Sequence, residues 1–179
     1  MLFRSRVEGP AQATVWGDPV HAFDMGALAA QWFSDLLGRP LRMLRFDPSH
    51  KRLASRRWTG DIEAENAFSD GFPLLVASTA SLADLNERLA ARGQAPVGME
   101  RFRPNLVLDG LEDAHAEDFI DELTIESPQG PIVLKLVKPC SRCSIPDVDP
   151  VTAETCHAIT DTLLPCNRPC NTEIGRAHV

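Results

Sequence analysis

Residues 132–143 read Ile-Val-Leu-Lys-Leu-Val-Lys-Pro-Cys-Ser-Arg-Cys, and this stretch decides how the chain is interpreted. The side chains alternate along residues 132–137: Ile132, Leu134 and Leu136 are expected to point inward and the residues between them outward, as in a strand. Pro139 lacks an amide hydrogen and is expected to end the strand. Cys140 and Cys143 would then lie at the start of a loop, where a rigid scaffold presents side chains to a ligand.

Two cysteines separated by two residues support three different chemistries. They can supply half of a zinc site, form a redox-active dithiol, or provide a thiolate ligand for a softer cofactor metal. The downstream candidates for further zinc ligands are Cys156, His157, Cys166 and Cys170. A redox dithiol is expected at the amino terminus of a helix, whereas Pro146, Asp147 and Pro150 predict a loop after Cys143. Spacing alone leaves the zinc and thiolate-ligand interpretations open.

The rest of the chain predicts further strands and two helices. The strands are expected at residues 11–16, 41–46, 73–78, 105–108 and 122–126. The first helix is expected to have Asp24 as its N-cap and to end at Gly38. The second is expected to begin near Ser81, where Asp84 completes a capping-box pattern, and to end at Gly93. The sequence therefore predicts a mainly β architecture with two helices (α+β), as a barrel or strongly curved sheet rather than a doubly wound fold.

The composition is that of an ordinary globular domain, with 44% hydrophobic and 24% charged residues among 179. A net charge of -7 repels phosphate backbones and argues against nucleic acid as the main partner. The longest apolar runs are far below the roughly 20 residues of a membrane span, and the first residues lack the apolar stretch of a signal peptide. We therefore expect a cytoplasmic protein whose five cysteines are free thiols or metal ligands.

Positive charge is concentrated between residues 39 and 57, although the chain as a whole is acidic. The basic residues of this stretch are Arg39, Arg42, Arg45, Lys51, Arg52, Arg56 and Arg57. The only acid among them is Asp47. Such a stretch can be a solvated face, or it can cradle an anionic phosphate, since guanidinium groups bind phosphate in a fork. The sequence alone leaves both interpretations open.

Five short motifs follow one another in the second half of the chain. They are Arg101-Phe-Arg-Pro-Asn105, Ala116-Glu-Asp118, Asp121-Glu-Leu123, Lys138-Pro-Cys-Ser-Arg-Cys143 and Val148-Asp-Pro150. In this combination and order the chain resembles the MOSC family from about Val15 to Leu164. Within that family it is similar to the bacterial hydroxylaminopurine-resistance reductases and the mitochondrial amidoxime-reducing component. The resemblance implies a MOSC-type β-barrel, which would be incomplete here.

The resemblance also implies a molybdenum–pterin cofactor (molybdopterin) whose metal is bound by one protein thiolate, matching Cys143. Soft sulfur donors suit this metal, and Cys140 is assigned a structural role beside the site. Arg103 and Asn105 match positions that contact the pterin and its phosphate, which suits a guanidinium fork and an amide. Without the resemblance, an arginine that caps a strand end is the simpler interpretation. The turn of Ser69, Asp70, Gly71 and Phe72 matches a segment that approaches the cofactor.

The activity that the resemblance implies is reduction of N-hydroxylated small molecules. Oxygen is removed from the substrate at molybdenum, and the electrons come from a separate iron–sulfur or haem protein. A second hypothesis is a sulfur-carrier or cofactor-handling module, because MOSC domains are also found attached to molybdenum-cofactor sulfurases. A third is a zinc-binding CxxC module.

The resemblance predicts a domain layout as well. Residues 1–45 match a remnant of an amino-terminal barrel domain, and residues 46–164 match the MOSC catalytic domain without its last strands. Residues 165–179 are expected to be non-native, because Ile174-Gly-Arg-Ala-His-Val179 matches the translation of a sequencing adapter. In this interpretation the chain is truncated at both ends, and by itself it is expected to retain little cofactor and to be inactive.

Overall fold

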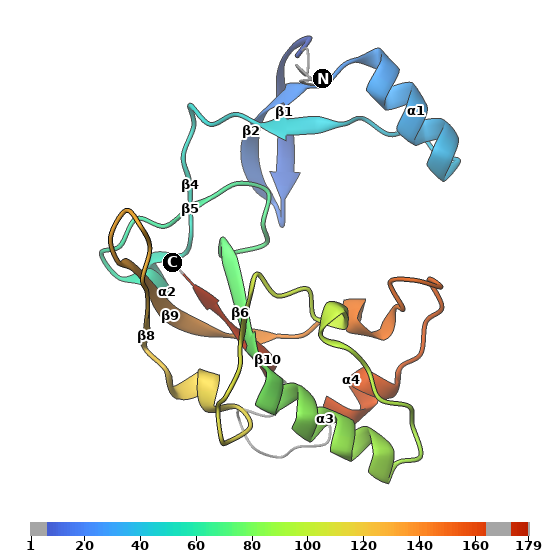
Figure 1. The fold of residues 1–179 in the computed structure, drawn as a ribbon. Helices are drawn as coiled ribbons and strands as arrows, with labels where there is room; N and C mark the ends of the chain where they lie inside the picture. Colours follow the sequence, from blue (N-terminus) through green and yellow to red (C-terminus); the bar gives the residue numbers. More distant parts are fainter. Residues whose placement is uncertain (1–6, 164–172, 179) are drawn as a thin grey trace. The chain divides into compact units, whose positions relative to one another are not determined.

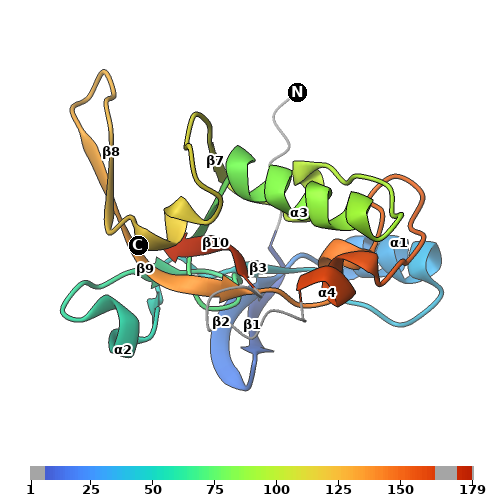
Figure 2. The same ribbon diagram turned by 90° about the horizontal axis from the view of Figure 1, so that it is seen from below.

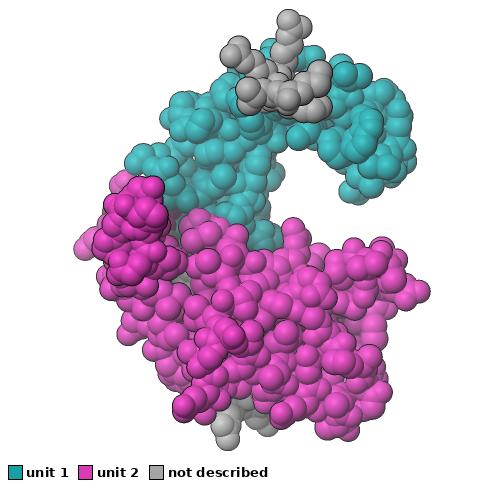
Figure 3. Space-filling view, viewed as in Figure 1, with its two compact units in different colours: residues 1–54, 65–71 teal, residues 55–64, 72–179 magenta. Residues whose placement is uncertain are grey.

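The computed structural model describes residues 7–163 and 173–178 (Figure 1). Within these residues the chain forms four α-helices and three small sheets, so the predicted mixture of helices and strands is confirmed. The chain divides into two compact units (Figure 3). Unit 1 comprises residues 1–54 and 65–71, and unit 2 comprises residues 55–64 and 72–179.

Unit 1 is built on an antiparallel sheet in the order β1-β2-β3. The strands are β1 (Gly9–Val15), β2 (Asp18–Asp24) and β3 (Leu44–Phe46), and a two-stranded sheet pairs β4 (Arg52–Leu53) with β5 (Glu65–Asn66). β1 alternates half-buried and exposed side chains as predicted. The sequence did not predict β2, because Pro19 signals a turn; here Pro19 lies next to the first residue of the strand, where the missing amide costs little.

Helix α1 (Ala27–Leu37) follows β2 and ends at Gly38, which adopts a left-handed conformation with φ of 65°. The prediction of Asp24 as N-cap was wrong, since Gly26 holds that position. Asp24 is the last residue of β2, and its Oδ1 accepts a hydrogen bond from the Gly26 amide at 2.8 Å. The carboxylate therefore stabilises the turn that leads into the helix rather than the first helical turn.

Unit 2 contains a five-stranded sheet in the order β7-β6-β10-β9-β8. Its described strands are β6 (Leu74–Ser78), β7 (Leu106–Leu108), β8 (Glu122–Ile125), β9 (Ile132–Ser141) and β10 (Glu173–His178). β6 and β7 pair in parallel, and the other described pairs are antiparallel. The described strands form open sheets, so the barrel stays a prediction. Figure 2 shows the β8–β9 hairpin projecting from the rest of unit 2, which agrees with the half-exposed side chains of Ile132 and Val133.

Helix α3 (Thr79–Ala91) begins two residues earlier than predicted, because Ser78 and not Ser81 is its N-cap: the Ser78 hydroxyl accepts a hydrogen bond from the Ser81 amide at 3.0 Å. Glu117, in the 3₁₀-helix η2 (Ala116–Phe119), is fully buried beside this cap. Its two carboxylate oxygens accept hydrogen bonds from the hydroxyls of Ser78 and Ser81 at 2.8 and 2.6 Å. The motif Ala116-Glu-Asp118 therefore ties η2 to the junction of β6 and α3.

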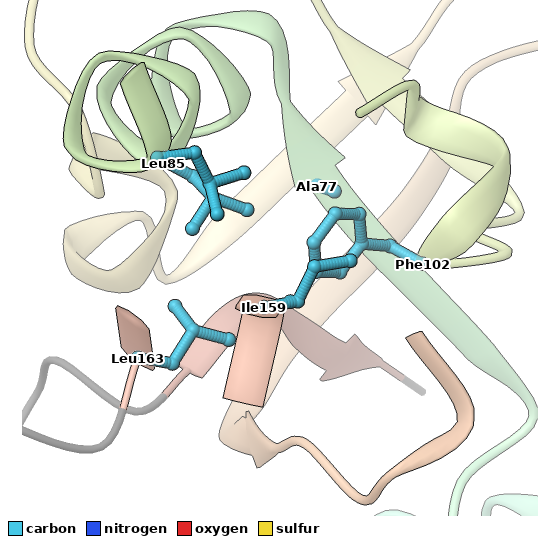
Figure 4. Close-up of a cluster of buried hydrophobic side chains, with 6 residues drawn as sticks. Ala77, Leu85, Phe102, Ile159 and Leu163 are labelled. Atoms are coloured by element: carbon cyan, nitrogen blue, oxygen red, sulfur yellow. The ribbon is translucent and has the colours of Figure 1, made fainter. Parts of the chain in front are cut away.

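The hydrophobic core of unit 2 lies where α3 meets α4 (Ala158–Leu163) and β6 (Figure 4). Its buried members are Ala77, Leu85, Leu89, Phe102, Ile159 and Leu163. Phe102 reaches this core from the end of the 3₁₀-helix η1 (Met99–Arg101). The prediction of two helices missed α4 and α2 (Arg56–Thr59), because six and four residues are too few to show a helical period.

Candidate functional site

The two cysteines at the end of β9 differ in exposure. β9 runs through Pro139 to Ser141, so the prediction that Pro139 ends the strand was wrong. The proline is tolerated because the pairing between β9 and β10 changes register next to it. Cys140 is therefore a strand residue and partly buried, whereas Cys143 follows the strand and is exposed. Both are free thiols.

Arg142, between the two cysteines, joins their loop to Phe102. Its Nη1 donates to Sγ of Cys140 at 3.3 Å, and its Nη2 donates to the carbonyl oxygen of Phe102 at 2.9 Å. The guanidinium carbon also lies 5.7 Å from the centre of the Phe102 ring, within range of a cation–π interaction. One side chain thus links the end of β9 to the core residue that precedes Arg103.

A second arginine makes a parallel connection between the same two segments. Nη2 of Arg101 lies 2.8 Å from Oδ2 of Asp149, and its Nη1 donates to the carbonyl oxygen of Pro146 at 3.3 Å. Segment 101–103 is therefore held against the loop of residues 140–149 at three points. Arg103 directly follows Phe102 and Cys143 directly follows Arg142, so these two predicted site residues are the chain neighbours of a hydrogen-bonded pair. Their shared role at a cofactor stays a prediction.

Arg103 and Asn105 carry hydrogen-bond donors at and just after this segment. Arg103 is exposed and has a positive φ of 54°, an uncommon conformation for a non-glycine residue. Among the described residues its guanidinium has no hydrogen-bond or ion-pair partner. Oδ1 of Asn105 accepts from the Leu75 amide at 2.8 Å, which leaves its Nδ2 free among the described residues. The two residues thus offer a cation and an amide donor next to the cysteine loop.

The turn of Ser69, Asp70 and Gly71 belongs to unit 1, and Phe72 to unit 2. Arg52 fixes this turn: its guanidinium donates to the carbonyl oxygens of Ser69 at 2.6 Å and Asp70 at 3.0 Å. The indole of Trp16 donates to Oδ1 of Asp70 at 3.0 Å. The carbonyl groups of Ser69 and Asp70 are thereby occupied, and a cofactor contact from other backbone groups of the turn stays a prediction.

Two aspartates organise the loop after Cys143. Asp147, fully buried, accepts hydrogen bonds from the amide and hydroxyl of Thr160 at 3.0 and 2.7 Å and so ties the 3₁₀-helix η3 (Ile145–Asp147) to α4. Asp149 accepts from the amides of Val151 and Thr152 at 2.8 and 3.0 Å. Hydrogen bonds from the Thr152 and Val151 amides, assisted by the charge of Arg101, hold the pKa of Asp149 below its ordinary value.

This lowered pKa predicts a pH-dependent stability. A carboxyl whose folded pKa is depressed stabilises the fold above its unfolded pKa, and the contribution disappears as the pH falls through the folded value. We expect Asp149→Asn to lower the melting temperature by a constant amount from pH 7 to about 5, and by progressively less below about pH 4. Calorimetry of the unmodified chain and of Asp149→Asn from pH 7 to pH 3 measures the difference between their melting temperatures. The other titrating groups are the same in both and cancel in this difference. A difference that stays constant down to pH 3 would contradict the assignment.

The remaining candidates of the sequence have other partners or fall outside the described residues. Arg42 pairs with Asp24, Lys51 with Glu65 at 3.1 Å, and Arg56 with Glu63 at 3.5 Å, which favours a structural role for these members of the basic stretch. Residues 7–163 and 173–178 contain no group of three or more metal-binding side chains. Cys166 and Cys170 of the zinc hypothesis lie outside these residues.

Sequence reasoning missed the roles of Arg142 and Arg101, although both lie inside the quoted motifs. Neither arginine belongs to a periodic pattern. The acceptors that join the two segments, Phe102 for Arg142 and Pro146 and Asp149 for Arg101, lie 40 or more residues away in the chain. The available signal was chemical: an arginine next to a candidate ligand has several hydrogen-bond donors that need acceptors nearby. That signal does not name the acceptor.

The domain mixes helices and strands and has an exposed thiol at Cys143. The segment that Arg142 joins to this loop carries a guanidinium at Arg103 and an amide at Asn105 whose donors have no partner in the part of the chain that the structure describes. This combination suits an anionic, metal-bearing ligand. A sequence model of the MOSC domain matches residues 63–170, and the chain belongs to the MOSC domain family. No helix in the described part of the chain has the length and apolar character needed to cross a membrane.

Curated relatives agree with this family. The chain is 40% identical over 142 residues to "Mitochondrial amidoxime-reducing component 1" of Homo sapiens, a match that covers 77% of this chain and 39% of the relative. It is 38% identical over 141 residues to "Mitochondrial amidoxime reducing component 2" of Macaca fascicularis, again over 77% and 39%. The chain thus spans about two fifths of the length of these relatives. Their names state a mitochondrial location, so the expected cytoplasmic location of this chain stays a prediction.

Proposed function

We propose that this chain is part of a molybdenum-cofactor-dependent reductase of N-hydroxylated compounds, with Cys143 as the thiolate ligand of the metal. The observation that carries the proposal is the exposed free thiol of Cys143, which lies in the loop after strand β9 of a MOSC domain, with Arg142 between it and the strand end. Cys140, by contrast, is partly buried and its Sγ accepts a hydrogen bond from Arg142. Of the pair, Cys143 is therefore the thiol available to a metal.

The neighbouring donors fit an anionic pterin cofactor. The Arg103 guanidinium and Nδ2 of Asn105 have no partner among the described residues, and the buried Nε of Arg142 also lacks one there. A guanidinium binds phosphate through two parallel hydrogen bonds, and an amide group can donate to ring or phosphate oxygens. We assign Arg103 to the phosphate and Asn105 to the pterin or its phosphate. We keep the turn of Ser69, Asp70, Gly71 and Phe72 as a further contact through its backbone.

When bound, the molybdenum–pterin cofactor supplies the redox chemistry that removes oxygen from nitrogen. The residues of this chain bind and orient it. Cys143 contributes the soft sulfur donor, while the loop that carries it is fixed by Arg101, Arg142 and Asp147. The predicted substrate is a small N-hydroxylated molecule, in keeping with the word amidoxime in the relatives' names, and the predicted electron donor is a separate iron–sulfur or haem protein.

Metal analysis separates this proposal from its alternatives. Because the chain spans two fifths of its relatives' length, the full-length protein that contains it is the appropriate sample, produced in cells that make the cofactor. We expect about one molybdenum per protein chain, as one thiolate ligand requires. Zinc in place of molybdenum would support the zinc-binding module and contradict the proposal. Neither metal, together with labile sulfur on Cys143, would instead support the sulfur-carrier module.

A further inference from the structure

Arg142 occupies a position between the two halves of the proposed site. Along the chain it directly precedes Cys143, and across space its Nη2 donates to Phe102, which directly precedes Arg103. Its Nη1 meanwhile donates to Sγ of Cys140. The same planar group therefore contacts the strand end on one side and the segment of Arg103 on the other.

The Phe102 end of this link lies in the hydrophobic core. Phe102 is fully buried in the core cluster with Leu85 and Ile159. Its carbonyl oxygen accepts from Arg142 on a residue that is packed into the core, and the Arg142 guanidinium lies over its ring as well. A guanidinium donates in a rigid, planar fork, so fixing two of its nitrogens also fixes the direction of the residue that carries it. In this way the hydrogen bond to a core residue restricts the loop that contains Cys143.

We propose that Arg142 is a positioning residue that holds the Cys143 thiol in place relative to Arg103 by bridging Sγ of Cys140 and the carbonyl oxygen of Phe102. The inference rests on the proposed function, since it assigns a purpose to the bridge in cofactor binding. It also gives the first cysteine of the pair a defined part: Cys140 is the acceptor that orients the guanidinium. The two cysteines thus have different tasks, one binding the metal and one supporting the loop.

Hydrogen exchange of the cofactor-free chain tests the bridge directly. We expect Arg142→Ala to accelerate amide exchange by about tenfold or more in both segments 102–105 and 140–145, as local opening becomes easier. Added ethylguanidinium should restore protection, because it can occupy the vacated volume and donate to both acceptors. Arg142→Lys should behave like Arg142→Ala, since one ammonium cannot supply the planar fork.

Arg92→Ala is the matched control. Nη1 of Arg92 also donates to a main-chain carbonyl oxygen of unit 2, that of Asp161, at 2.7 Å, but it does so at the α3–α4 contact. We expect it to leave exchange in segments 102–105 and 140–145 unchanged. If Arg142→Ala folds poorly, Cys140→Ala removes one acceptor alone; it should raise exchange in segment 140–145, and its effect should not add to that of Arg142→Ala. Unchanged exchange in Arg142→Ala, or no restoration by ethylguanidinium, overturns the bridge.

Molybdenum content of the full-length protein then separates the positioning role from the proposed function. We expect Cys143→Ser to lose the metal and Arg142→Ala to retain at least tenfold less than Arg92→Ala at a similar melting temperature. Full metal content in Arg142→Ala, with none in Cys143→Ser, would overturn the positioning role and leave the proposed function standing. Full content in Cys143→Ser would overturn both.

Discussion

Replacing Cys143 by Ser is expected to lower the rate at which the full-length protein reduces a model amidoxime by more than about 100-fold, since losing even a group that only orients a metal ligand costs 10–100-fold. The substitution exchanges sulfur for oxygen with little change in volume. A hydroxyl is a harder donor that does not ionise near neutral pH, so it cannot replace a thiolate ligand. Substrate turnover with a chemical reductant, measured beside bound molybdenum, gives the result independently of the electron-donor protein.

Cys156→Ser provides the control for this substitution. Cys156 is a free, exposed thiol of the same unit, so the change is chemically identical and no more disruptive to packing. Its turnover and metal content should equal those of the unmodified protein. Equal losses in both variants would show a general sensitivity to thiol replacement, and full activity in Cys143→Ser would remove the ligand assignment and with it the proposed function.

Local sequence patterns predicted the strands of unit 2 well. β6, β7 and β8 lie within two residues of the predicted segments. β6 and β7 are short apolar runs, and β8 alternates polar and apolar residues, so each carries a local strand pattern. β9 shows the limit of this reasoning. Pro139 lacks a hydrogen-bond donor and was expected to end the strand, but the register change opposite it removes the need for that donor. The register of a partner strand is a property of the fold and cannot be predicted from the sequence of β9 alone.

The helix starts show a second limit. Ser78 and Ser81 are both serines, a residue type that commonly caps helices. The spacing from Ser81 to Asp84 matched a capping box and so predicted a helix start near Ser81. The buried carboxylate of Glu117 accepts from both hydroxyls, so the choice between them depends on a contact from 36 or 39 residues away. Capping rules rank candidates by type and spacing. A tertiary hydrogen bond of this kind can override that ranking.

The candidate site divides in the same way. Motif order singled out Cys143, Arg103 and Asn105, and all three lie in unit 2. The thiol of Cys143 is exposed, and the donors of Arg103 and Asn105 have no partner within residues 7–163 and 173–178. The interactions that hold them there were not predictable, because the bonds of Arg101 and Arg142 join segments far apart in the chain. β10, in the tail that was predicted to be non-native, pairs with β6 and β9. This pairing uses main-chain groups that every sequence carries, so it does not test the prediction of a non-native tail.

Phe102→Ala is expected to destabilise unit 2 by about 3–5 kcal/mol, the usual cost of removing a buried phenylalanine from a core. Phe102 is fully buried and packs with Leu85, Ile159 and Leu163. Truncation leaves a cavity lined by these aliphatic side chains, and it also removes the ring on which the Arg142 guanidinium lies. Urea unfolding followed by circular dichroism measures the change, as a lower midpoint at similar slope.

Phe119→Ala is the matched comparison, because the same side chain is removed from a position that is 80% exposed. Its free energy of unfolding should stay within about 0.5 kcal/mol of the unmodified chain. The two substitutions have the same effect on the unfolded state to a first approximation, so their difference isolates packing in the core. Equal effects would show that Phe102 is not buried in solution. The site would then lose its fixed point, because the carbonyl oxygen that orients Arg142 belongs to the same residue.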